Sequence, residues 1–145
     1  MDWITSKNLI DYQEALNIME TKVDNILNNN HTETIWLLEH PDVYTAGTSA
    51  KSKDLKNPTK FPVITTNRGG QFTYHGPGQR IVYLMINLKR FNFDIRKYIF
   101  FLEELIIASL NDFNIESHRW KQAIGVWTYK DFPTHSSNNF PRYKI

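Results

Sequence analysis

Apolar residues recur at intervals of three and four along two stretches of the chain, and this spacing predicts two amphipathic helices. The first runs from Asn8, its expected N-cap, to Leu27, and the second follows Asp94, its expected cap, to about Asp112, with Asn114 as terminator. The inward stripes are Tyr12, Leu16, Met19, Val23, Ile26 and Leu27 in the first helix, and Tyr98, Phe101, Leu102, Leu105, Ile106 and Leu110 in the second. We interpret the first stripe as core rather than as a partner-binding face.

Short runs of β-branched, aromatic and aliphatic residues predict strands over residues 34–39, 61–66, 81–88, 115–120 and 123–128. The last two are separate strands or a hairpin, and residues 43–48 are a strand or a loop. Residues 81–88 are the most apolar run, which predicts a central strand. The order of helix, strands, helix and strands predicts an α+β fold, with helices on one face of a mostly antiparallel or mixed sheet.

Composition narrows the class of protein. The 145 residues are long enough for one domain with a sizeable core, and 41% of them are apolar. A net charge of +2 is too balanced to favour nucleic acid or an anionic membrane as partner. The chain has no run long and apolar enough for a membrane span and no signal-peptide pattern at its start, so we expect a cytoplasmic protein. Residues 49–60 contain four lysines and predict a solvated loop, with a specific anion site as the less favoured alternative.

Cysteine is absent from the sequence, which excludes disulfides, thiolate metal sites and a cysteine nucleophile on these residues. The five histidines (His31, His40, His75, His118 and His135) show no metal-ligand spacing, so no metal site is expected.

The stretch from Arg68 to Arg80 is the part of the sequence richest in candidate chemistry. It holds four of the six glycines, in two turn signals, Gly69-Gly70 and Gly76-Pro-Gly78. The residues between them predict a short strand that places a cation, an amide, a hydroxyl and an imidazole around a pocket. A tight hairpin with solvated polar positions is the alternative, and the spacing of the common phosphate-binding glycine motifs is absent.

Three blocks identify a family resemblance. The segment Arg68-Gly-Gly-Gln-Phe-Thr-Tyr-His-Gly-Pro-Gly-Gln79 resembles the signature of the octanoyltransferases, the lipoyl(octanoyl) transferases of protein lipoylation. Upstream, Glu39-His-Pro-Asp-Val-Tyr-Thr-Ala-Gly47 resembles a second family block, and Gly125-Val-Trp127 resembles a third. The resemblance covers residues 4–128, so we expect residues 1–128 to be the N-terminal part of an octanoyltransferase-like catalytic domain.

The resemblance implies the fold of the biotin and lipoate ligases, a mixed sheet with helices packed on it, here incomplete at the C-terminus. It implies transfer of octanoyl from acyl carrier protein to a lysine of lipoyl domains in 2-oxoacid dehydrogenases and of the glycine cleavage H protein. It implies no cofactor. In the family the octanoyl group is held as a thioester on a cysteine, which a nearby lysine keeps as thiolate.

The resemblance assigns the acyl-substrate site to Arg68, Gly69, Gly70, Gln71, Phe72, Thr73, Tyr74 and His75. No catalytic residue carries over, because the cysteine is missing and Lys130 lacks the sequence context of the family's lysine. We therefore expect an inactive chain. Structural roles for Arg68, as a surface charge, and for His75, bonded within the turn, are the alternatives.

Residues 129–145 contain two prolines and no periodicity, so they predict an irregular tail outside the family, consistent with a frameshift or degraded sequence. Two other functions stay open, namely a non-catalytic acyl or acyl-carrier binding remnant and a relative of the lipoate and biotin ligases. Ligases favour three glycines where this chain has Gly69-Gly70-Gln71, which favours the transferase.

Overall fold

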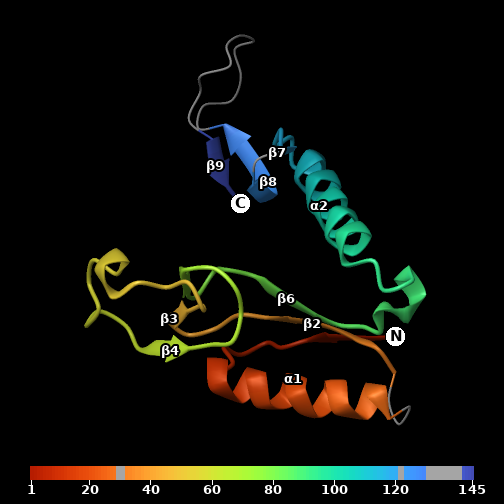
Figure 1. The fold of residues 1–145 in the computed structure, drawn as a ribbon, viewed down its shortest axis with the longest axis horizontal. Helices are drawn as coiled ribbons and strands as arrows, with labels where there is room; N and C mark the ends of the chain where they lie inside the picture. The colour runs from red at the N-terminus through yellow and green to blue at the C-terminus, as the bar shows by residue number, and fades with distance from the viewer. Residues whose placement is uncertain (29–31, 121–122, 130–141) are drawn as a thin grey trace. The chain divides into compact units, whose positions relative to one another are not determined.

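The chain divides between Asn87 and Leu88 into two units in the computed structural model (Figure 1). The structure describes residues 1–28, 32–120, 123–129 and 142–145. Small mixed or antiparallel sheets and two long helices make up the described residues, which confirms the α+β class. None of the described helices is long and apolar enough to cross a membrane.

The first sheet of unit 1 is built on β2 (Thr34–Leu38). This strand lies between β1 (Asp2–Thr5), which is parallel to it, and β6 (Ile81–Met85), which is antiparallel. Helix α1 (Tyr12–Leu27) runs alongside this sheet (Figure 1). The shared core consists of Ala15, Ile26, Trp36, Leu38 and Met85. Burial of alternate β2 residues is what the pleat of a strand with one covered face produces.

The position of β6 differs from the prediction. The sequence predicts a central strand, but in the described part of unit 1 this strand pairs with β2 alone and lies at the edge of its sheet. Its residues are mostly half-buried, and Val82 is exposed. An apolar run shows that a strand packs on a core, but it does not show on how many sides the strand is paired.

The start of α1 also differs from the prediction. Asp11 is the N-cap, not Asn8, and its carboxylate accepts hydrogen bonds from the backbone amides of Gln13 at 2.8 Å and Glu14 at 3.1 Å. The amide of Ile10 donates to the carbonyl of Glu39 at 2.9 Å, which holds the preceding residues outside the helix. The predicted stripe is correct at Tyr12 and Ile26, whereas Val23 and Leu27 are exposed.

The second sheet of unit 1 carries the glycine-rich stretch. Strand β3 (Val43–Ala46) lies between β4 (Val63–Thr65), parallel to it, and β5 (Phe72–His75), antiparallel to it. Strands β4 and β5 match predicted strands, and β3 forms where the sequence left a strand or a loop open. The connection from β3 to β4 contains a short 3₁₀ helix, η1 (Ser52–Asp54), and is almost entirely exposed, as the lysine-rich composition predicts.

Unit 2 contains η2 (Leu88–Phe91), α2 (Ile95–Asp112) and an antiparallel sheet of β7 (His118–Trp120), β8 (Ala123–Tyr129) and β9 (Arg142–Lys144). Its helix begins and ends as predicted. Asp94 caps it by accepting a bond from the amide of Lys97 at 3.0 Å, and Asn114 follows its end with φ of 57°.

Two predictions for unit 2 are wrong in part. Phe101, Leu105 and Ile106, all placed on the inward face of α2, are exposed, and no residue of α2 is buried. Strand β9 forms inside the stretch predicted to be irregular, because its backbone pairs with β8 and pairing does not require a periodic side-chain pattern. The remainder of that stretch, residues 130–141 with Lys130 and His135, lies outside the described residues, as does His31.

Candidate functional site

Arg68 connects the glycine-rich loop to β3 through hydrogen bonds of its guanidinium group. One terminal guanidinium nitrogen, Nη2, donates to the carbonyl of Thr45 at 2.8 Å, to its Oγ1 at 2.7 Å and to the carbonyl of Gln71 at 2.9 Å. The other, Nη1, donates to the carbonyl of Gly69 at 3.0 Å. Four acceptors of the protein itself therefore surround this cation. Its principal interactions are structural, close to the alternative that the sequence leaves open.

A row of backbone hydrogen bonds joins residues 47–49 to the same loop. The amides of Gly47, Thr48 and Ser49 donate to the carbonyls of Gln71, Arg68 and Gly70 at 3.2, 2.9 and 3.0 Å. A Cβ on Gly47 would lie 2.9 Å from the carbonyl oxygen of Gly69 and closer still to that of Gly70. Only glycine fits at this crossing of two backbone segments.

The two glycines of the loop differ in their surroundings. Gly70 has φ of +88°, a conformation that favours glycine, so its role is in the turn. A Cβ on Gly69 would meet nothing within 4 Å. The space beside Gly69 is therefore open, and a ligand can approach its backbone closely.

The residues of β5 do not all face one site. Tyr74 donates its hydroxyl to the carboxylate of Asp42 and packs its ring at 5.9 Å from Tyr44 and 5.4 Å from Phe61. This hydrogen bond raises the pKa of Tyr74. Because successive strand residues point to opposite faces, His75 lies on the other side of the sheet. The structure thus separates Tyr74 from His75, although the sequence groups them.

His75 belongs to a cluster of four rings. It stacks on Tyr12 with centroids 5.8 Å apart and 17° between the planes, and it lies edge-on to His40 at 5.8 Å. Its Nδ1 is 2.9 Å from Oε1 of Gln79, which belongs to the Gly-Pro-Gly-Gln turn. That turn is held in place by Glu39, whose carboxylate accepts from the amide of Gly78 at 2.8 Å and pairs with Arg80 at 3.2 Å.

His40 is fully buried at the base of this cluster. Its Nδ1 is 2.7 Å from the carbonyl of Ile10, and its Nε2 is 2.9 Å from the hydroxyl of Tyr83. A carbonyl only accepts, so Nδ1 carries the proton, and the Tyr83 hydroxyl donates to Nε2. Both ring nitrogens of His40 are therefore occupied within the protein.

Burial keeps three of the four rings uncharged. Desolvation lowers the pKa of His40 and raises the pKa of Tyr83. It also raises the pKa of Tyr12, with the positive charge of Arg68 acting in the opposite direction. At neutral pH these three side chains therefore carry no charge.

His75 is the member of the cluster best placed to meet a ligand. It is half-buried, and in the part of the chain that the structure describes no hydrogen bond is recorded for its Nε2. The side-chain amide of Gln79 can present either its oxygen or its nitrogen to Nδ1, because a half-turn of the amide group exchanges the two atoms. Nε2 of His75 can consequently serve either as a donor to a carbonyl oxygen or as an acceptor.

Three residues of this cluster were not predicted as site residues. Sequence reasoning placed Tyr12 in the core stripe, Tyr83 in an apolar strand, and His40 at the end of a strand. The only signal for any of them was the position of His40 inside the block Glu39–Gly47. Their convergence depends on pairings between segments 28 to 71 residues apart, which periodicity does not reveal.

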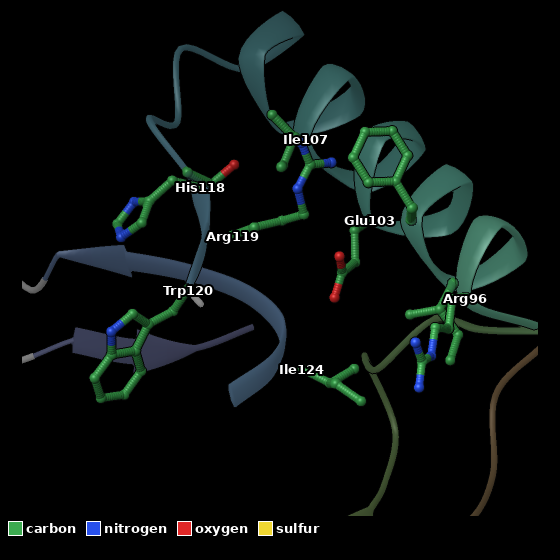
Figure 2. Close-up of a pocket in the computed structure, with 10 residues that line it drawn as sticks. Arg96, Glu103, Ile107, His118, Arg119, Trp120 and Ile124 are labelled. Atoms are coloured by element: carbon green, nitrogen blue, oxygen red, sulfur yellow. The ribbon is translucent and has the colours of Figure 1, made fainter. Parts of the chain in front are cut away.

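Unit 2 contains a separate groove with a cavity volume of about 760 Å³ (Figure 2). It is lined by Arg96, Ile99, Phe100, Glu103, Ile107, Ser117, His118, Arg119, Trp120 and Ile124. Internal interactions occupy two of its charged groups: Glu103 accepts from the amide of Gly125 at 2.8 Å, and Arg119 pairs with Glu104 and lies 3.9 Å from the ring centroid of Phe100. None of the predicted site residues contributes to this groove.

Comparison with known proteins gives one consistent result. A family model described as the lipoyl protein ligase A/B catalytic domain matches residues 11–133. The chain is 52% identical over its whole length to the octanoyltransferase of Bartonella quintana (strain Toulouse) and covers 60% of that protein. It is 54% identical over 90% of its length to the Bartonella henselae octanoyltransferase, covering 53% of it. It is 46% identical over its whole length to the one from Dinoroseobacter shibae, covering 66% of it. The chain thus spans between about half and two thirds of the curated relatives it matches.

Proposed function

The chain belongs to the family of lipoyl protein ligase A/B catalytic domains, and on this premise we propose that it carries the acyl-binding half of an octanoyltransferase. The reaction is transfer of an octanoyl group from acyl carrier protein to a lysine amine of a lipoyl domain. The observation that carries the proposal is the match over residues 11–133, which includes both the glycine-rich loop and the ring cluster. The high identity to proteins named octanoyltransferase supports the transferase over a ligase.

We assign the octanoyl site to the stretch Arg68–His75. The open space beside Gly69 admits the acyl chain against the backbone, and each methylene buried there contributes about 0.8 kcal/mol. Nε2 of His75 donates to the thioester carbonyl when Gln79 turns its amide nitrogen toward Nδ1, because Nδ1 is then the acceptor and the ring proton is on Nε2. Arg68, Gly70, Gln71 and Thr73 hold the loop in shape. Tyr74 makes no contact with the acyl group, because it faces the other side of β5 and packs against Tyr44 and Phe61.

The nucleophile is missing from these 145 residues. An acyl-enzyme thioester requires a cysteine, and the sequence contains none. We therefore propose that this chain binds the octanoyl group but does not transfer it. Lys130 is given no role, and the division into residues 1–128 and a non-family tail of 129–145 remains a prediction.

The partners follow from the reaction class. They are octanoyl-acyl carrier protein as donor and, as acceptors, the lipoyl domains of 2-oxoacid dehydrogenases and the glycine cleavage H protein. We place the chain in the cytoplasm, where these proteins act. The near-balanced charge gives no reason to add nucleic acid or a membrane.

The test is a pair of assays on the purified chain. Octanoyl-pantetheine, a small thioester, should bind, whereas octanoyl-carrier protein incubated with an apo lipoyl domain should give no octanoylated product by intact mass. His75→Ala should weaken octanoyl-pantetheine binding, and Tyr74→Phe, on the other face of β5, should leave it unchanged. Octanoylation of the lipoyl domain would refute the inactive chain, and labelling that depends on ATP and free octanoate would favour a ligase.

A further inference from the structure

The connection from β3 to β4 concentrates the positive charge of the chain. Residues 49–60 contain four lysines and one aspartate, a net charge of +3, whereas the whole chain has +2. Lys51, Lys53, Lys56 and Lys60 are all exposed. Among the residues that the structure describes, no ion pair is recorded for any of the four, so their charge is available to a partner.

This lysine loop, residues 51–60, has a defined shape. The amide of Asp54 donates to the carbonyl of Lys51 at 2.8 Å, and that of Leu55 to the carbonyl of Ser52 at 3.2 Å, which closes η1. A second turn brings the amide of Lys60 to 3.4 Å from the carbonyl of Asn57. In Figure 1 the loop, drawn in yellow, extends outward from the strands β3 and β4. The lysines are therefore presented on a projecting feature.

Both ends of the lysine loop are attached to the proposed octanoyl site. Before it, the amides of Thr48 and Ser49 bind the carbonyls of Arg68 and Gly70. After it, the ring of Phe61 packs at 5.4 Å from the ring of Tyr74. A protein bound to the lysines is thus held beside the loop that receives the acyl group.

We propose that the lysine loop docks the donor, an acidic carrier protein that bears its acyl thioester on a flexible arm. The inference rests on the proposed function and adds the surface that the carrier recognises. Complementary charge brings the two proteins together and orients them, while the arm reaches the open space beside Gly69. Lysine ammonium groups suit this task, because they are strongly hydrated point charges that attract an acidic surface without fixed geometry.

An acidic protein fits this surface better than a nucleic acid or an anionic membrane does. Asp54 interrupts the four lysines, and the aromatic side chains of Tyr44 and Phe61 flank the end of the loop, where Lys60 lies 4.8 Å from the Phe61 ring centroid. Outside residues 49–60 the rest of the chain has a net charge of −1, since the total is +2. A nucleic acid or an anionic membrane requires a wider basic surface.

The test uses a loop variant that combines Lys53→Glu with Lys56→Glu. The control variant, which combines Lys7→Glu with Lys97→Glu, has the same change in charge, and all four lysines are exposed. Binding of octanoyl-carrier protein to the whole chain is measured by fluorescence anisotropy at several salt concentrations. The loop variant should bind about tenfold more weakly and lose most of its salt dependence. The control should stay within about twofold of the original chain. Equal melting temperatures for the variants ensure that only the surface has changed.

Each outcome separates the docking surface from the acyl site. If the loop variant binds octanoyl-pantetheine normally but the carrier protein weakly, the inference holds. Equal weakening of carrier binding in both variants overturns the inference. It is also overturned if the loop variant still binds the carrier normally but loses binding to an apo lipoyl domain, to RNA or to anionic vesicles. Failure of the unaltered chain to bind octanoyl-pantetheine refutes the proposed function, whereas binding of that thioester without binding of the carrier refutes the docking surface alone.

Discussion

Replacement of Gly47 by alanine tests whether the crossing of two backbone segments holds the glycine-rich loop in place. The added Cβ would lie 2.8 Å from Nη1 of Arg68 and 2.9 Å from the carbonyl oxygen of Gly69, with the carbonyl of Gly70 nearer still. The guanidinium end of a side chain can move aside. The two carbonyls belong to backbone that is fixed by other hydrogen bonds, so the segments must separate.

The loss in free energy of unfolding follows from the contacts that are disrupted when the two backbone segments separate. Forcing a methyl group into packed backbone costs about 1–3 kcal/mol. The amides of Gly47, Thr48 and Ser49 each bind a carbonyl of the facing loop, and each weakened bond adds about 0.5–1.5 kcal/mol. We therefore expect a loss of about 2–4 kcal/mol in the free energy of unfolding, since not all three bonds break completely.

Urea denaturation followed by circular dichroism gives this free energy, and hydrogen exchange reports on the three amides individually. The matched control is Gly69→Ala, because a Cβ there meets nothing within 4 Å and should change stability by less than about 0.5 kcal/mol. Gly47→Ala should also abolish binding of octanoyl-pantetheine. Equal stability of the two variants would refute the reasoning from backbone contact. A destabilised Gly47→Ala that still binds the thioester normally would show that the loop is not the acyl site.

Three further predictions concern the surroundings of this loop. Burial lowers the pKa of His40, so the stability that its neutral ring contributes is present above the ordinary pKa near 6.5 and is lost as the pH falls through the folded pKa. His40→Gln should therefore reduce the fall in melting temperature between pH 7.5 and 5. An unchanged pH dependence in this variant would contradict the argument. Arg68→Lys replaces the planar guanidinium by one ammonium group and should lower the free energy of unfolding in urea by about 1–2 kcal/mol, with faster hydrogen exchange of the Thr48 amide. Unchanged exchange of that amide would show that Arg68 does not hold the loop to β3. Phe101 is 53% exposed, so Phe101→Glu should reduce binding of the dye ANS and cost less than about 0.5 kcal/mol in the free energy of unfolding. Undiminished dye binding would show that ANS binds to a different apolar surface.

Local chemistry in the sequence was sufficient to place the ends of α2. Asp94 caps the helix and Asn114 adopts a positive φ after it, because both effects depend on neighbours within four residues. The start of α1 was misplaced by three residues, although both Asn8 and Asp11 are good capping residues. A long-range hydrogen bond from Ile10 to Glu39 decides between them, and no local pattern contains that information.

The predicted site shows the same limit. The glycine pattern correctly indicated that backbone shape matters between Arg68 and His75, and the strand inside it was confirmed. The pattern did not indicate that Arg68 binds carbonyls of its own chain or that Tyr74 and His75 face opposite ways. It also missed His40, because a histidine with both nitrogens occupied by distant partners looks the same in sequence as any other.

The distribution of charge around the loop bears on the choice between transferase and ligase. Desolvation leaves His40 neutral, and Arg68 is enclosed by four acceptors of the protein. A ligase binds the phosphates of a nucleotide and so requires cations and amides free to receive them. An acyl thioester is uncharged and requires only apolar contact and one donor for its carbonyl, which Gly69 and His75 can supply. Because Arg68 already binds four acceptors of its own chain, the site that we propose suits a neutral acyl group better than a phosphate.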